Sequence, residues 1–440
     1  MTICQEIANK MADPNQVCDI VEGNLLRDQF PSSAWLKESF ADGLPGIACF
    51  YGAMDWIFPD SGWDKITFQY LQLAARELEK NGHDNSSLFY GLCGLCFAFN
   101  FCSHQETRYQ NILGKLENVL SQEIQSSFLD RARFYIDQRA DLPSSLYNLG
   151  NGLSGILGYL LMRKNNDYLY QIALESVKTL VQLFRPLDDG SQPQWLIGSE
   201  FQVNEEDSDK YPEEGSLLNM SFGITGCLAS LSLASLEGLD VEGLKETICY
   251  IANWIKAQKK IINNQIYWPN TVPFFRNQAA SQDNLTAISN ELYRDTWWQG
   301  IPAVTRSLYL ASKALDDPEL EKFAEESIIA MFSKSYKDWN HTGTSFIHGR
   351  AGILTTVYRM AQSTENPLLW KQVQILEDDL SGFYRPNSAF GFQMEDVDEK
   401  EQYQSVDHPG LLYGAAGIGL SLLLVEKRED LNWDRAFLTH

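Results

Sequence analysis

The stretch Phe346-Ile347-His348-Gly349-Arg350-Ala351-Gly352 indicates how the whole chain folds. A short approach ends in Gly-x-x-Gly, and apolar residues three and four positions apart then follow, as they do in a helix. The same form occurs six more times, although in the fifth repeat Ala303 replaces the second glycine. The first glycines of the seven repeats are Gly43, Gly91, Gly152, Gly223, Gly300, Gly349 and Gly414. Each repeat is long enough for two helices and their loops.

Seven helix pairs that bury a face only against their neighbours predict one all-α domain over residues 1–440. With 44% hydrophobic residues, the chain can fill a large core. Glycine at each helix start permits both unusual dihedrals and close approach of backbones. At the fifth repeat, alanine at position 303 predicts a turn that needs close approach of the backbones but no unusual dihedral.

The segments between the repeats predict further elements. Residues 1–40 read as one or two helices with a turn at 31–33, and Leu113 to Ile124 and Leu320 to Phe332 read as outer helices. The gap between Glu237 and Asp295 is rich in proline and aromatic residues, which favours an ordered loop or a short hairpin. We expect the charged tail after Glu426 to fray.

The net charge of −23 argues against nucleic acid and anionic lipid as partners. The start of the chain lacks the pattern of a signal peptide, and no apolar run approaches about 18 residues, so we expect a cytoplasmic protein without membrane insertion. Acidic residues cluster in 204–209, at 213–214 and in 395–401. These runs are either solvated loops or a docking surface for a basic peptide.

Four of the eight cysteines, Cys49, Cys93, Cys96 and Cys227, lie in or just after glycine motifs, at expected helix interiors. This placement favours buried, reduced thiols over disulfides. The alternative is a metal or redox set made of Cys93-x-x-Cys96 with Cys102 and His104. A set of that kind would require the helix to break.

The residue before each first glycine should lie at a similar height around one mouth of the domain. These mouth residues are Asp42, Tyr90, Asn151, Phe222, Gln299, His348 and Tyr413. Their mixture of apolar faces and hydrogen-bonding tips suits a peptide or small-molecule pocket. Alternatively, they only plug the axis of the domain.

Seven such helix starts, together with Arg294-Asp295-Thr296-Trp297-Trp298-Gln299-Gly300-Ile301-Pro302 and His348-Gly349, resemble the lanthionine synthetase C family of stand-alone lanthipeptide cyclases. The resemblance implies an α/α toroid of seven inner and seven outer helices. It also implies thioether ring formation, in which a cysteine of a precursor peptide adds to a dehydroalanine or dehydrobutyrine. The partners implied are this dehydrated, cysteine-containing peptide and a complex of dehydratase and transporter. In the family, two cysteines and a histidine hold zinc.

The chain departs from the family at most of these functional positions. Trp298 and Ile347 stand where the family has its zinc cysteines, and of the three ligands only His348 matches. Phe222 replaces a histidine thought to transfer protons, and Asn148 replaces an acidic residue. Because one histidine cannot hold catalytic zinc, we predict no metal at this site.

Three functions follow as hypotheses. In the first, the protein is a zinc-free cyclase with the catalytic residues His348, Arg294 and Asp295. Its substrate-binding residues would be Trp298, Phe222, Asn148, Gln299, Tyr90, Tyr413 and Ile347. In the second, it is an inactive binding or scaffold protein for a peptide or partner enzyme; binding of a small molecule, such as the glutathione suggested for eukaryotic relatives, comes third.

The candidate catalytic residues also have structural readings. His348 would then hydrogen-bond the turn backbone, and the pair Arg294-Asp295 would pin the loop that enters the fifth repeat. His83, His341 and His408 lie in polar, turn-like stretches and need no special role.

Overall fold

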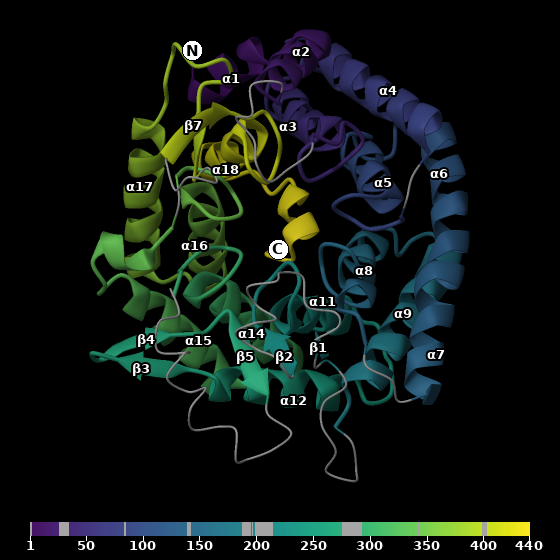
Figure 1. Ribbon diagram of the computed structural model, residues 1–440, viewed down its shortest axis with the longest axis vertical. Coiled ribbons are helices and arrows are strands. Elements are labelled where there is room, and N and C mark those ends of the chain that lie inside the picture. The colour runs from purple at the N-terminus through teal and green to yellow at the C-terminus, as the bar shows by residue number, and fades with distance from the viewer. Residues whose placement is uncertain are drawn as a thin grey trace. The chain divides into compact units, whose positions relative to one another are not determined.

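The computed structural model describes residues 2–25, 35–82, 85–138, 142–186, 195, 197–198, 214–274, 293–341, 343–397 and 403–440. Seven of its helices have the first glycine of a repeat as their N-cap. These inner helices are α3 (Leu44–Ile57), α5 (Leu92–Phe101), α8 (Leu153–Met162), α11 (Ile224–Leu236), α14 (Ile301–Leu315), α16 (Arg350–Thr364) and α18 (Ala415–Lys427). The predicted helix starts are confirmed (Figure 1).

Close approach of backbones explains most of the first glycines. A Cβ on Gly43 or Gly91 would lie 2.3 Å from a backbone carbonyl oxygen, although both glycines have extended dihedrals that any residue adopts. Gly300 differs, because its φ is +79° and an added Cβ would lie 1.9 Å from the carbonyl oxygen of Arg294. We expected the fifth turn to need close backbone approach but no unusual dihedral. That expectation is wrong, because the turn also needs the positive φ of Gly300.

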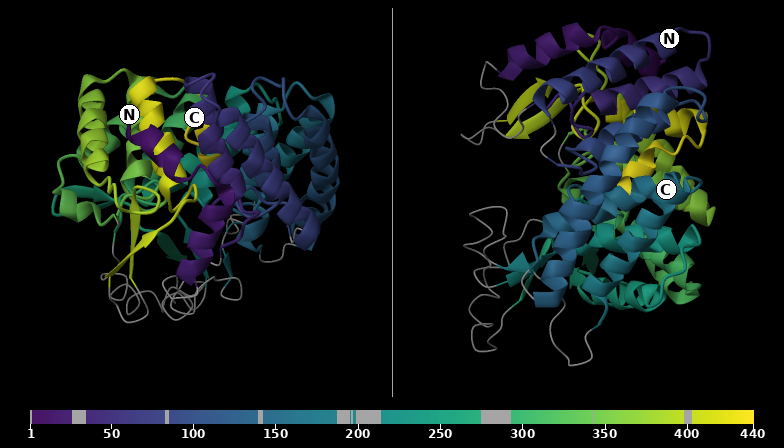
Figure 2. Two further views of the ribbon diagram at one scale, coloured as in Figure 1. Left: turned by 90° about the horizontal axis from the view of Figure 1, so that it is seen from above. Right: turned by 90° about the vertical axis from the view of Figure 1, so that its right-hand side faces the viewer.

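The described chain forms two compact units. The first unit comprises Met1–Leu120, His341–Asp434 and His440, and the second comprises Ser121–Asn340 and Arg435–Thr439. Besides its inner helices, the first unit contains α1 (Ile3–Lys10), α2 (Pro14–Leu25), α4 (Trp63–Asn81), α17 (Pro367–Gly382) and the hairpin β6 (Gln393–Val397) to β7 (Tyr403–Asp407). Helix α4 packs on α3, α17 packs on α16, and α1 packs on α18 (Figure 2). That residues 1–440 form one domain stays a prediction.

The outer helices bury one stripe each. In α4 the buried residues include Thr67, Tyr70, Leu71 and Ala74, which share one face at spacings of three and four. The inner helices are buried almost all round, as α11 is from Ile224 to Ala234. This difference between a striped and a fully apolar helix is why the outer helices lie between the core and solvent.

The second unit holds the remaining elements. Its helices include the π-helical turn η1 (Ile124–Leu129), α7 (Asp130–Gln138), the 3₁₀ turn η2 (Ser144–Leu146), α9 (Asp167–Phe184), α12 (Leu244–Ala257), α15 (Pro318–Met331) and the 3₁₀ turn η6 (Tyr336–Trp339), and α6 (Gln110–Glu123) leads into it. Its strands are β1 (Ile197–Gly198), β2 (Glu214–Leu217), β3 (Lys260–Ile262), β4 (Gln265–Tyr267) and β5 (Thr271–Phe274).

Several segment predictions are confirmed here. Helices α6 and α15 are the two predicted outer helices. In the gap between Glu237 and Asp295, β3 and β4 pair as the short antiparallel hairpin, α12 precedes them, and residues 275–292 lie outside the described residues. A second antiparallel sheet has the order β1-β2-β5, with Leu217 opposite Thr271. The expected turn at 31–33 lies outside the described residues. Within the described ranges, the structure has no helix that is both long and apolar enough to cross a membrane.

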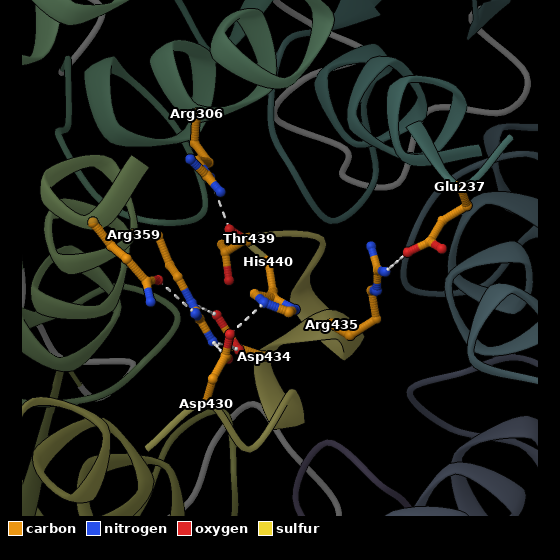
Figure 3. Close-up of polar contacts among 9 residues, drawn as sticks. Glu237, Arg306, Arg359, Asp430, Asp434, Arg435, Thr439 and His440 are labelled. Atoms are coloured by element: carbon orange, nitrogen blue, oxygen red, sulfur yellow. Dashed lines mark hydrogen bonds and ion pairs between the residues drawn. The ribbon is translucent and has the colours of Figure 1, made fainter. Parts of the chain in front are cut away.

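The tail after Glu426 does not fray, which corrects the sequence-based expectation. It forms the 3₁₀ turn η7 (Trp433–Phe437), in which Asp434 and Phe437 are 0% exposed. Arg359, itself 1% exposed, donates two hydrogen bonds to the Asp434 carboxylate at 2.7 and 2.6 Å in the first unit. In the second unit, Arg306 donates to the Thr439 carbonyl oxygen at 2.7 Å (Figure 3). Paired charges and buried rings hold the tail in place.

Candidate functional site

Six of the seven inner helices are preceded by a turn with the same hydrogen bond. A side-chain oxygen, four positions before the first glycine, accepts the backbone N–H of the mouth residue at 2.7–3.4 Å. The pairs, acceptor first, are Ser39 with Asp42, Ser87 with Tyr90, Asn148 with Asn151, Asn219 with Phe222, Thr296 with Gln299, and Ser345 with His348. Ser, Thr and Asn form such turns readily. The sequence carried this signal, and our reading of it missed the pattern.

The seventh turn uses a different residue. Gly410 stands at the acceptor position and has no side chain, and the Nδ1 atom of His408 accepts the Gly410 N–H at 3.0 Å. His408 is buried, and burial lowers its pKa to about 4, so its ring is neutral at physiological pH. His408 thus shapes the turn before Tyr413.

The first unit holds four of the predicted site residues. His348 and Tyr413 lie together, with ring centroids 6.1 Å apart, and Tyr413 contacts His408 at the same distance. His348, Tyr413 and Tyr90 are half-buried, whereas Ile347 is only 4% exposed. The side chains of His348 and Tyr413 can therefore meet a ligand, and the side chain of Ile347 belongs to the core.

The second unit holds the other predicted binding residues. Trp298 and Phe222 are half-buried, and their loops are joined because the Met220 N–H donates to the Trp298 carbonyl oxygen at 2.7 Å. Gln299 is 5% exposed, and its Oε1 accepts no hydrogen bond from the described residues. Asn148 is 1% exposed and its Oδ1 holds the turn, so Asn148 acts here as a turn former.

Asp295 is anchored on both carboxylate oxygens. Its Oδ2 accepts from Lys334 Nζ at 2.7 Å, and its Oδ1 accepts the Ile301 N–H at the start of α14, at 3.0 Å. The Lys334 ammonium also lies 3.7 Å from the centre of the Tyr267 ring, a cation–π contact. Burial raises the pKa of Asp295 and lowers that of Lys334, and the attraction between them opposes both shifts. These contacts support the structural reading of Asp295, while Arg294 beside it is half-buried.

The cysteines lie mostly in the core. All eight are free thiols, seven of them buried, and the Cys102 Sγ donates to the Ala48 carbonyl oxygen at 3.3 Å. Burial raises the pKa of Cys227 to about 12, so this thiol stays protonated. The prediction of buried, reduced thiols is confirmed. The residues that the structure describes contain no group of three side chains able to hold a metal.

The residues at the family's zinc positions do not fit zinc. Trp298 offers only an indole N–H, which donates and cannot ligate, and Ile347 offers no polar atom. His348 alone leaves at least two ligands missing from the three that a catalytic zinc needs.

Asp42 is the residue whose importance our sequence reading missed, although it lies among the mouth residues. It is 4% exposed, and its Oδ1 accepts no hydrogen bond in the described part of the chain. Burial raises its pKa to about 7. The sequence does single out Asp42, because it is the only acidic residue among the seven mouth residues.

Some predictions fall on residues that the structure does not describe. His83 and the acidic runs 204–209 and 398–401 lie outside the described residues, and no side chain is described for 395–397. The proposal of an acidic docking surface is therefore untested.

Comparisons with known proteins point to one family. Residues 34–438 match a family described as "Lanthionine synthetase C-like protein". A curated relative, "Nisin biosynthesis protein NisC" of Lactococcus lactis subsp. lactis, is 20% identical over 322 residues, which are 72% of each chain. A solved structure, "Nisin cyclase", matches with a TM-score of 0.74 and 18% identity, and covers 97% of this chain and 98% of that one. A likeness at this identity concerns the fold, and it confirms the predicted fold class, the α/α toroid.

Proposed function

Because the chain belongs to the lanthionine synthetase C-like family, we propose that it binds a dehydrated, cysteine-containing precursor peptide and closes thioether rings in it without zinc. The family match over residues 34–438 carries the proposal. The solved relative of the same fold is a cyclase by name, and we extend that activity to this chain.

The reaction is within reach of a site without a metal. The peptide thiol loses its proton, its sulfur bonds to the β-carbon of the dehydroamino acid, and a proton returns to the α-carbon. Holding both groups in contact supplies several kcal/mol of the barrier by orientation alone. A base that accepts the thiol proton supplies about 10²- to 10⁴-fold more.

We assign roles to the residues as follows. His348, half-buried against Tyr413, is a candidate base, since an imidazole titrates near neutral pH. Arg294 is a candidate for orienting a substrate carbonyl, and Asp295 holds the loop beside it. Candidate binding residues are Tyr90 and Tyr413 in the first unit and Trp298, Phe222 and Gln299 in the second. Burial gives Ile347, and its turn hydrogen bond gives Asn148, a structural role instead.

A thiol-capping mass assay tests the proposal. Ring closure leaves the peptide mass unchanged, so the readout is loss of alkylatable thiol in a dehydrated precursor peptide, with and without protein and with and without chelator. We expect thiols to disappear faster with the protein, and chelator to make no difference. A slow His348→Ala variant would place His348 in the mechanism, and an unchanged rate would remove it.

The second candidate is a binding or scaffold protein without activity. It is favoured by one observation: Trp298, Ile347 and Phe222, all bulky and apolar, stand where the family has polar, reactive side chains. In that case the peptide binds, every thiol is capped at the background rate, and Trp298→Ala weakens binding while His348→Ala has little effect.

The setting we propose is the cytoplasm, in which eight free cysteines stay reduced. A dehydratase must act before this protein, because the chain supplies only the ring-closing half of the chemistry. A complex with that dehydratase and with a peptide transporter is the corresponding partner proposal.

A further inference from the structure

Asp42 has an uncompensated carboxylate in the turn before α3. The Asp42 N–H donates to Ser39 Oγ at 3.1 Å, and the carbonyl oxygen of the preceding residue, Ala41, accepts from the N–H groups of Leu411 and Leu412 at 3.0 and 2.8 Å. The side-chain Oδ1 of Asp42 has no comparable contact, because it is buried and accepts no hydrogen bond from any described residue. A buried polar atom without a partner costs free energy, and in a native protein it calls for an explanation.

The titratable group linked electrostatically to the Asp42 carboxylate is Tyr90, which is uncharged. Tyr90, in the turn before α5, is half-buried; burial and the Asp42 carboxylate both raise its pKa, so its phenol stays protonated. His408, whose ring is neutral, comes from the loop before α18, where a Cβ added to Gly410 would lie 2.7 Å from the His408 ring and 2.5 Å from the Asp42 carbonyl oxygen. Tyr413 contacts His408, and His348 contacts Tyr413. Among the described residues, no cation offsets the burial of this carboxylate, which is why its pKa lies near 7.

We propose that Asp42 is the residue that accepts the thiol proton of the substrate in this protein. This inference rests on the proposed function and moves the role of thiol base from the candidate His348 to Asp42. The cysteine S–H transfers its proton to the Asp42 carboxylate, the sulfur bonds to the β-carbon, and the carbon–carbon double bond opens. The proton then passes from the Asp42 carboxyl to the α-carbon. No oxidant or reductant is needed, and the carboxylate is restored.

The chemistry suits this residue. A general base works best when its pKa lies near the operating pH, and an ordinary exposed aspartate is too acidic to take a proton from a thiol of pKa about 8.5. Burial moves Asp42 to about 7, within reach of that value. Tyr90, fixed by Ser87 in the neighbouring turn, adds a neutral phenol that can donate a hydrogen bond to a substrate carbonyl.

The test compares Asp42→Asn with wild type in the thiol-capping assay between pH 5.5 and 9. In wild type we expect the rate to rise through an inflection near pH 7 and then level off. In Asp42→Asn we expect at least a tenfold loss at pH 7 and no inflection there, with the affinity for the peptide unchanged within about twofold. Asp55→Asn is the matched control, because it makes the same change at the other end of α3, in a carboxylate paired with Arg108 at 2.7 Å.

The outcomes separate the two proposals. If wild type itself runs at the background rate, the proposed function fails and this inference fails with it. If wild type is active and Asp42→Asn keeps its rate and its inflection, only the assignment of Asp42 is overturned. Should Asp42→Asn fail to fold, Asp42→Glu takes its place: a displaced inflection supports the assignment, and an inflection at the wild-type pH overturns it.

Discussion

The turn before α3 and the turn before α14 each bury an aspartate, Asp42 at 4% exposure and Asp295 at 2%. Asp295 has a buried ammonium, Lys334, on one oxygen and a backbone N–H on the other. Asp42 has no partner for its Oδ1 among the described residues, and no cation beside it. The difference teaches how to tell a structural carboxylate from a candidate reactive one: both are buried, but only one has its charge satisfied by the fold.

The largest effect should come from removing the charge at Asp295. Asp295→Asn leaves Lys334, whose side chain is 0% exposed, charged and without a counter-ion. We expect a loss of about 3–5 kcal/mol in the free energy of unfolding, measured by urea denaturation. The double variant Asp295→Asn, Lys334→Met should recover much of that loss. A loss below about 1 kcal/mol in the single variant would show that the pair is not structural.

At Asp42 we expect removal of the charge to raise the free energy of unfolding at pH 8, the opposite of its effect at Asp295. The pKa of Asp42 is about 7 in the folded state and about 3.9 when unfolded, so this group favours folding below pH 4, and that stability is lost as pH rises to 7. By pH 8 the cost reaches roughly 4 kcal/mol in wild type, and Asp42→Asn avoids it. Unfolding at pH 4.5 and pH 8 should show the variant gaining over wild type only at the higher pH. An equal difference at both values would mean that Asp42 does not titrate in this range.

The smallest effect concerns the hydrogen bonds that shape the two turns. Ser39 Oγ accepts the Asp42 N–H and also donates to the Phe89 carbonyl oxygen at 3.2 Å, whereas Thr296 Oγ1 accepts the Gln299 N–H at 3.1 Å. Ser39→Ala and Thr296→Ala should each cost about 1 kcal/mol, and the serine more because it loses two bonds. Thermal unfolding resolves this difference. Equal unfolding midpoints for the two variants would show that the second hydrogen bond of Ser39, to the Phe89 carbonyl oxygen, adds no stability.

Much of the fold could be predicted because it is written in local pattern. Gly-x-x-Gly followed by an apolar run marks a helix start wherever it occurs, and Gly43 and Gly414 cap their helices as Gly349 does. The outer helices α6 and α15 followed from spacing alone. These features need only residues a few positions apart, which a sequence displays directly.

What could not be predicted depends on partners far along the chain. Lys334 meets Asp295 across 39 positions, and Arg359 meets Asp434 across 75. Trp433 and Phe437 stand among charged residues, which is why the sequence predicts a frayed tail. In the structure the tail is ordered, because the buried Arg359 is the partner of Asp434. Burial of Asp42 likewise depends on the loop before α18, which closes over it from the other end of the sequence.

The first unit is discontinuous in the chain, and this has a consequence for its synthesis. Helix α1 packs on α18, and the Cys4 thiol donates to the Gly419 carbonyl oxygen at 3.7 Å. Residues 121–340 of the second unit are made in between, which at about 5–20 residues per second takes on the order of tens of seconds. During that delay the faces of α1 and α3 that pack on α18 stay uncovered. We therefore expect the nascent chain to expose this apolar surface and the Cys4 thiol until α18 has been made.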